Sequence, residues 1–143
     1  LERAEQYNLS FIQLHGSESP DLCRKIGTSG LRVIKAFGIG SDFDFEKLIP
    51  YAPVCDFFLF DTQTERFGGT GLRFNWDLLN RYELEVPFFL SGGISLEDAG
   101  MIRSLNHPLL HAADINSKFE ISPGVKDPEK VKSFIQEIKS SKI

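Results

Sequence analysis

Five short apolar runs recur along the chain, and each is followed by a polar turn and then by apolar residues at helical spacing. Apolar runs of this length, bounded by turn residues, are typical of buried strands. Strands that alternate with helices predict an α/β fold with a parallel sheet and right-handed crossovers. We expect the five strands within Leu9–Leu14, Leu31–Phe37, Val54–Phe60, Val86–Leu90 and Leu109–Ile115.

Three of the helices have clear start signals. Ser19, Pro20 and Asp21 form an N-cap, a first-turn proline and a first-turn acid, and Gly27 is expected to end that helix. Ser95 and Asp98 have the spacing of a capping box for a helix over 96–104. Asp127, followed by Pro128 and Glu129, opens a last helix that is expected to reach about Ser140. Weaker helical patterns cover 43–48 and 76–82.

Composition and charge narrow the class of protein. The 143 residues are 41% hydrophobic and show no linker or composition break, so residues 1–143 are expected to form one domain. A net charge of −4 without a cluster of Lys and Arg gives no basic surface that would bind nucleic acid or an anionic membrane.

Cys23 and Cys55 lack CxxC spacing and a nearby His pattern, which favours reduced thiols in the cytoplasm over a zinc site or a disulfide. No apolar stretch is long enough to span a bilayer. The first residues read as the middle of a helix, without Met or a signal peptide, so the chain is expected to be cut from a longer one.

Polar residues follow nearly every apolar run. Asp61 ends an apolar strand and precedes a glycine-rich loop, and His15, Ser91, Asp114 and Asn116 hold similar positions. The carboxyl ends of parallel strands carry the chemistry in α/β folds. This pattern predicts a functional site at the carboxyl ends of the strands.

The glycines after the fourth run are candidates for phosphate binding. Gly92 and Gly93 follow a strand and precede a capped helix, so their backbone N–H groups are free to meet a phosphate, although an ordinary tight turn explains them as well. Asn116 and Ser117 follow the last run and are expected to complete the same cradle, unless they only cap the strand end. Gly69 belongs to a GGTG segment that lacks P-loop spacing and is interpreted as a lid or a tight loop.

Other polar residues allow two interpretations each. His15, at a strand end, is either a general acid or base or a structural hydrogen-bonding group. Lys35, within an apolar strand, needs a partner if it is buried, and a structural ion pair is favoured over contact with a substrate anion. His107 and His111 are expected to be structural, and Trp76 is expected in the core.

Five segments in the same order and spacing resemble phosphoribosylanthranilate isomerase of tryptophan biosynthesis, from Leu9 to the last helix. They are QLHG, IKAFG, LFDT with GGTG and FNW, LSGGI, and DINSKFE with PGVKD. The resemblance implies a (β/α)8 TIM barrel that performs an Amadori rearrangement with no cofactor and no metal. It also implies that Asp61 is the general acid for ring opening, with a pKa raised by partial burial. Gly92, Gly93, Asn116 and Ser117 would then hold the phosphate of a small phosphorylated substrate, with the GGTG loop over it.

The chain departs from the family at its other half. The family's general base is a cysteine in a KICG-type motif on the first strand, and an arginine-containing loop after the second strand recognises the anthranilate; neither motif is present. The five runs match strands four to eight, so the resemblance implies a partial (β/α)8 barrel of five βα units without the base, and little or no activity for this chain alone. The two open sheet edges are then expected to be covered by a second copy, as in a homodimer. The alternatives are another phosphate-binding barrel enzyme, a non-catalytic phosphate-binding module and a purely structural fragment.

Overall fold

A curved parallel sheet forms the centre of the molecule. The computed structural model describes residues 2–62 and 74–140. The sheet has the order β1-β2-β3-β4-β5, and every pair of neighbouring strands is parallel. The α/β class and the five parallel strands predicted from the sequence are therefore confirmed. The strands are β1 (Phe11–Leu14), β2 (Arg32–Ile39), β3 (Phe57–Thr62), β4 (Phe88–Leu90) and β5 (Leu110–Ala113).

The strand ends differ from the predicted ends for local reasons. Asn8 has a positive φ of 50°, so the chain turns just before β1 and Leu9 lies outside the strand. β4 begins after Pro87, which has no N–H to donate to a neighbouring strand. β2 is longer than predicted because Gly38 and Ile39 pair with Asp61 and Thr62 of β3. This extra pairing supports the end of β3 that carries Asp61.

The predicted helix caps are present. In α2 (Pro20–Gly27), the Ser19 side chain accepts a hydrogen bond from the Leu22 N–H. The helix ends at Gly27, as predicted, and Thr28 is its C-cap. The nearest glycine with positive φ is Gly30 (φ 87°), so Gly27 itself does not take the left-handed conformation of a glycine cap. In α4 (Pro128–Lys139), Asp127 accepts from the backbone of Glu129 and Lys130.

The segment after β4 starts as a tighter helix than predicted. Ser95 and Asp98 form the expected capping box, with Asp98 Oδ2 2.9 Å from both the Ser95 backbone nitrogen and its Oγ. The first turn is the 3-10 helix η3 (Leu96–Asp98), and α3 (Ala99–Leu105) continues from it to Asn106, which has a left-handed φ of 44°. The helix therefore lies where it was predicted, but its first turn is a 3-10 helix and not an α-helix.

The two weakly predicted helices are 3-10 helices. They are η1 (Phe45–Val54) and η2 (Trp76–Arg81). Pro50 and Pro53 lie inside η1, and each removes a backbone donor and disfavours α-helical geometry in the residue before it.

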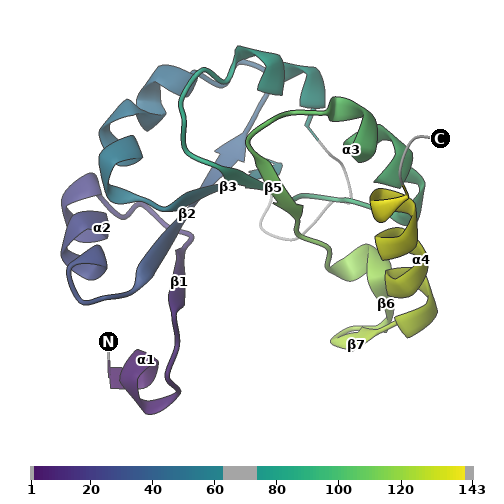
Figure 1. Cartoon of the computed structure of the whole chain (residues 1–143), viewed down its shortest axis with the longest axis horizontal. Helices are drawn as coiled ribbons and strands as arrows, with labels where there is room; N and C mark the ends of the chain where they lie inside the picture. Colours follow the sequence, from purple (N-terminus) through teal and green to yellow (C-terminus); the bar gives the residue numbers. More distant parts are fainter. Residues whose placement is uncertain (1, 63–73, 141–143) are drawn as a thin grey trace.

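The helical segments between the strands lie along the outer side of the arch formed by the sheet (Figure 1). Side chains on that side of β3 and β4, including Phe58, Phe60 and Phe88, are fully buried and pack with Tyr82 in edge-to-face geometry. The Tyr82 hydroxyl donates to the Val86 carbonyl at 2.6 Å. Trp76 is 4% exposed in this cluster, as predicted. These contacts form the main core and hold the middle strands in register.

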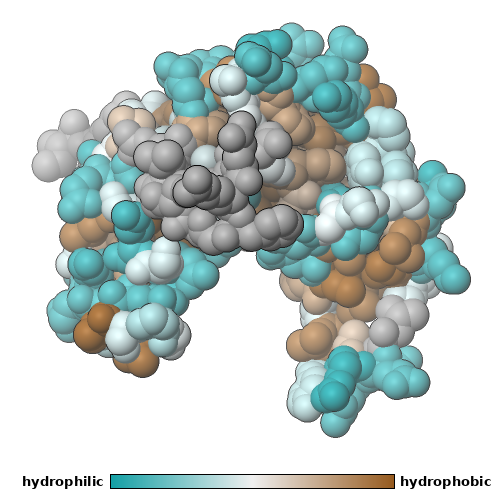
Figure 2. All heavy atoms as spheres, turned by 180° about the vertical axis from the view of Figure 1, so that it is seen from behind, coloured by the Kyte–Doolittle hydropathy of each residue, from teal (hydrophilic) through white to brown (hydrophobic). Residues whose placement is uncertain are grey.

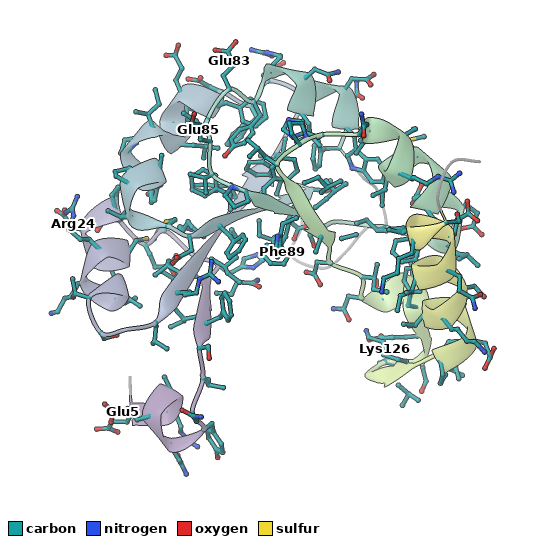
Figure 3. The ribbon with its side chains drawn as sticks, in the orientation of Figure 1. Glu5, Arg24, Glu83, Glu85, Phe89 and Lys126 are labelled. Atoms are coloured by element: carbon teal, nitrogen blue, oxygen red, sulfur yellow. The ribbon has the colours of Figure 1, made fainter. Side chains whose placement is uncertain are left out.

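The opposite, inner face of the sheet carries a second group of rings. Arg32 lies over the rings of Phe11 and Phe57, at 4.8 Å from each centroid. Phe57 also contacts Phe89 and His111, at 5.2 and 4.7 Å between ring centroids, and Phe89 lies near the middle of the arch (Figure 3). Because strand side chains alternate between faces, these residues point away from the helices. The packing of His111, and that of His107 against Tyr82 and Phe88, fits the predicted structural role of both histidines.

A hairpin that was not predicted follows β5. The short 3-10 helix η4 (Ser117–Phe119) leads into β6 (Glu120–Ser122), which pairs antiparallel with β7 (Val125–Lys126). Pro123 and Gly124 form the turn, and Gly124 has the positive φ of 80° that a turn of this kind needs at its third residue. The hairpin places Lys126 opposite Glu120.

Within the described ranges, β1 and β5 each pair on one side only, and they are not neighbours. Figure 2 shows the result as an arch whose two legs are separated by an open gap. At the leg that starts the chain, α1 (Glu2–Gln6) precedes β1, and Leu9 and Phe11 are 52% and 42% exposed. The sheet therefore offers two edges with unpaired backbone groups.

Candidate functional site

The carboxyl ends of β1, β3, β4 and β5, with the loops that follow them, surround one cavity of about 320 Å³. Parallel pairing brings these ends to the same edge of the sheet, so residues far apart in sequence meet there. Of the seven predicted site residues, His15, Asp61, Gly92, Gly93, Asn116 and Ser117 line this cavity, and Gly69 lies outside the described residues. The other lining residues are Gln13, Leu59, Ser91, Ile94, Asp114 and Lys118.

Asp61 is the acid at the end of β3. It faces the cavity from the inner side of the sheet and is half-buried. Its Oδ1 accepts a hydrogen bond of 2.8 Å from the Thr62 backbone N–H. This bond occupies Oδ1, and among the described residues no hydrogen bond reaches Oδ2.

Gly92 touches this carboxylate. Its φ is +92°, and a Cβ added there would lie 2.6 Å from Asp61 Oδ1 and 2.5 Å from the Thr62 backbone nitrogen. Such distances are well inside van der Waals contact, so a side chain at this position would displace Asp61 or the end of β3. Gly92 therefore allows the loop after β4 to pack directly against the acid, in addition to having a conformation that favours glycine.

The loops after β4 and β5 are linked to the neighbouring strands. The Ser91 N–H donates to the Phe60 carbonyl at 2.8 Å, and the Ser91 hydroxyl donates to Asp114 Oδ2 at 3.2 Å. The Asp114 N–H donates in turn to the Leu90 carbonyl at 2.7 Å. These bonds hold the ends of three strands together beneath Gly92 and Gly93, which both have positive φ.

The segment after β5 brings amide and cationic groups to the cavity. Asn116 and Ser117 lie where the sequence placed them, and the Asn116 side-chain oxygen accepts a hydrogen bond from Lys126 of the hairpin. Lys118, which sequence reasoning missed, also lines the cavity. The available signal was its position directly after Ser117, because a cation beside a predicted phosphate cradle is a plausible ligand by charge alone.

His15 reaches the cavity from the loop after β1. Its Nδ1 lies 3.4 Å from Nε2 of Gln13. Gln13 is a lining residue that sequence reasoning named within a motif but did not assign to the site.

The buried lysine has the structural pair that was favoured from the sequence. Lys35 Nζ lies 3.3 Å from Glu18 Oε2 and donates to the carbonyls of Gly16 and Ala36 at 2.9 Å. Burial by itself would raise the pKa of Glu18, but hydrogen bonds from its own backbone and from the Gly16 N–H, together with Lys35, outweigh burial and lower it. Lys35 thus anchors the loop that follows β1 and does not line the cavity.

Both cysteines lie away from the cavity. Cys23 is fully buried in α2, and Cys55 follows η1 at the opposite end of β3 from Asp61. Both are free thiols. Burial raises the pKa of both, that of Cys55 to about 12. Neither thiol is placed or ionised to act as a base at this site.

The described residues contain no group of three or more His, Cys, Asp or Glu side chains that could hold a metal ion. Within the same ranges, no helix is long and apolar enough to cross a membrane.

Comparisons with known proteins agree on one family. A family profile described as N-(5'phosphoribosyl)anthranilate (PRA) isomerase matches residues 1–137. The curated N-(5'-phosphoribosyl)anthranilate isomerase of Parabacteroides distasonis is 49% identical over 138 residues, covering 96% of this chain and 62% of the relative. The protein of the same name from Phocaeicola vulgatus is 41% identical, covering 97% of this chain and 68% of the relative.

Solved structures give the same result. A phosphoribosyl anthranilate isomerase from Thermus thermophilus matches with a TM-score of 0.78 at 26% identity, covering 96% of this chain and 64% of that one. A structure described as monomers of the dimeric isomerase from Thermotoga maritima matches with a TM-score of 0.75 at 30% identity, covering 98% and 65%. The chain therefore spans about two thirds of the length of these relatives. Over that shared length, both sequence and backbone show that the chain belongs to the N-(5'-phosphoribosyl)anthranilate isomerase family.

Proposed function

We propose that this chain carries the acid and the phosphate-binding part of an isomerase site of tryptophan biosynthesis. The reaction converts N-(5'-phosphoribosyl)anthranilate into 1-(2-carboxyphenylamino)-1-deoxyribulose 5-phosphate. The observation that carries this proposal is the contact between Gly92 and Asp61, because it joins a phosphate-binding loop to a carboxyl group at one cavity.

Asp61 acts as the general acid in this proposal. Its Oδ2 donates a proton to the ribose ring oxygen as the bond between that oxygen and C1 breaks, which gives the open-chain Schiff base. Removal of the C2 proton by a base then yields the enolamine, which tautomerises to the ketose. The Oδ1 hydrogen bond from Thr62 supports this assignment, since it holds the carboxyl group in one orientation.

The phosphate is bound by the loops after β4 and β5. The backbone N–H groups of Gly92 and Gly93 and the polar groups of Asn116 and Ser117 act as donors to its oxygens. Anchoring the phosphate there positions the ribose carbons beside Asp61, which reduces the entropic cost of reaching the reactive geometry.

The second half of the site comes from outside these 143 residues. The sequence contains no KICG-type motif, and both cysteines lie away from the cavity. We therefore expect the five strands to be part of a (β/α)8 barrel, with little or no turnover by this chain alone. The full reaction needs the portion of the relatives that has no counterpart here.

The open edges of β1 and β5 suggest how the chain behaves by itself. Unpaired edges and exposed Phe11 favour self-association, so we expect a cytoplasmic homodimer in which a second copy covers them. A monodisperse monomer in light scattering would contradict this expectation.

Turnover tests the isomerase assignment. The chain is incubated with N-(5'-phosphoribosyl)anthranilate, alone and together with a polypeptide equivalent to the unmatched portion of the Parabacteroides relative, and the ketose product is quantified. We expect product only in the mixture, and its loss in Asp61→Asn. Turnover by the chain alone at the rate of an intact relative would refute the claim that these residues form only half of the active site. Unchanged turnover in Asp61→Asn would refute the assignment of Asp61 as the general acid.

A further inference from the structure

Lys126 is attached to the cavity through a neighbouring side chain. It lies on β7 directly opposite Glu120 on β6, and its Nζ is 2.7 Å from Glu120 Oε1. The same Nζ donates to Asn116 Oδ1. In Figure 3, Lys126 lies on the hairpin at one leg of the arch. Asn116 lines the cavity, whereas Lys126 does not.

This contact determines which end of the Asn116 amide is available to a ligand. A lysine ammonium carries three donors and no acceptor, so only the amide oxygen of Asn116 can pair with it. The oxygen is therefore held at Lys126, and the two N–H donors of the amide remain for other partners. If the amide were reversed, the ammonium would lose its bond to Asn116 and keep only Glu120, and the amide oxygen would become the group presented to the ligand.

The charges around the cavity make this orientation important for an anion. Asp61 and Asp114 line the cavity, and both are acidic, while Lys118 is the lining lysine. A phosphate entering beside two carboxylates needs hydrogen-bond donors, and an amide oxygen would repel it. The hydrogen bond with Lys126 lowers the pKa of Glu120, so that carboxylate stays ionised and keeps the ammonium in place near neutral pH.

We propose that Lys126 is a positioning residue for phosphate recognition, holding Asn116 so that its amide N–H groups face the phosphate of a phosphorylated sugar. This inference rests on the phosphate cradle of the proposed function. It extends that function by assigning a role to the hairpin, which contributes no residue to the cavity.

The test measures the dissociation constant of inorganic phosphate for the full chain and its variants. Lys126→Met removes the hydrogen bond and one charge, Lys126→Arg restores both, and Lys132→Met removes one charge from an exposed position on α4. Because a hydrogen bond to a charged group is at stake, we expect Lys126→Met to weaken phosphate binding about 10-fold. Lys126→Arg should recover most of this loss, and Lys132→Met should change binding less than about 2-fold.

A double-mutant cycle with Asn116→Ala separates positioning from charge. If Lys126 acts through Asn116, Lys126→Met should have almost no further effect in the Asn116→Ala background. The side-chain N–H resonances of Asn116 should also shift on phosphate addition in the unmodified chain and in Lys126→Arg, but not in Lys126→Met. If Lys126→Met weakens phosphate binding equally in the unmodified chain and in Asn116→Ala, the positioning role of Lys126 is wrong. That result would not contradict the proposed phosphate site itself. Absence of saturable phosphate binding by the unmodified chain would overturn both, whereas the turnover experiment tests the isomerase reaction separately.

Discussion

Gly92 is the residue whose substitution should have the largest effect at the site. An alanine Cβ there would lie 2.5 Å from the Thr62 backbone nitrogen and 2.6 Å from Asp61 Oδ1. The positive φ alone should cost about 1–2 kcal/mol. Forcing the neighbouring groups apart should add about 1–3 kcal/mol. We therefore expect Gly92→Ala to lower the free energy of unfolding by about 2–5 kcal/mol, a large share of the roughly 5–15 kcal/mol of an ordinary domain.

Two other glycines provide matched controls. Gly30 and Gly124 have φ values of +87° and +80°, but an added Cβ would have no atom within 4 Å at either position. Gly30→Ala and Gly124→Ala should therefore show the conformational cost without the steric one. Urea unfolding can be followed by the fluorescence of Trp76, the single tryptophan, which is 4% exposed. If Gly92→Ala loses no more stability than the two controls, the close contact with Asp61 is not the reason for glycine at this position.

Three further predictions concern charge and ionisation. Lys118→Gln should weaken phosphate binding several-fold and reduce its salt dependence, as measured by titration at two ionic strengths, whereas Lys132→Gln should change neither. The lowered pKa of Glu18 means that its stabilising contribution is present above the ordinary glutamate pKa and is lost as the pH falls through the lowered value. The unfolding free energies of the unmodified chain and Glu18→Gln should consequently converge in acid. A constant difference between them from pH 6 to pH 3 would contradict a stabilising ion pair between Glu18 and Lys35. Because Cys23 is fully buried and its pKa is raised, it should react with a thiol reagent at pH 8 only as fast as the chain unfolds, whereas the partly buried Cys55, whose pKa burial raises to about 12, should react far more slowly than an ordinary exposed thiol.

The strands, and the position of the site at their carboxyl ends, could be predicted from local sequence. Each apolar run is short and flanked by turn residues, which is the pattern of a buried strand. The strands are in fact buried on the face that packs against the helices, so the pattern predicted them. Asp61, Gly92 and Asn116 follow different strands, yet parallel pairing alone predicts that they meet. The capping residues Ser19 and Asp127 act within a few residues of their own position, which is why they could be assigned without any tertiary information.

The parts that could not be predicted depend on contacts between distant residues. Nothing in the local sequence shows that the bare Cα of Gly92 packs on Asp61, because the two are 31 positions apart and meet only through the sheet. Lys126 was visible only as part of a family motif, since its contact with Asn116 requires the hairpin that Pro123 and Gly124 turn. The 3-10 geometry of η1 could have been anticipated from Pro50 and Pro53, which remove the donors an α-helix needs.

The central claim is that one cavity joins a phosphate-binding loop to the acid Asp61. Its most direct test is a titration of the isotope-labelled chain with ribose 5-phosphate, followed by the backbone amide resonances of Gly92 and Gly93 and the carboxyl resonance of Asp61. The account predicts saturable shifts at all three positions with one dissociation constant, while the amide of Gly30 stays unchanged. Shifts that leave Gly92 and Gly93 unaffected, or that never reach Asp61, would contradict it.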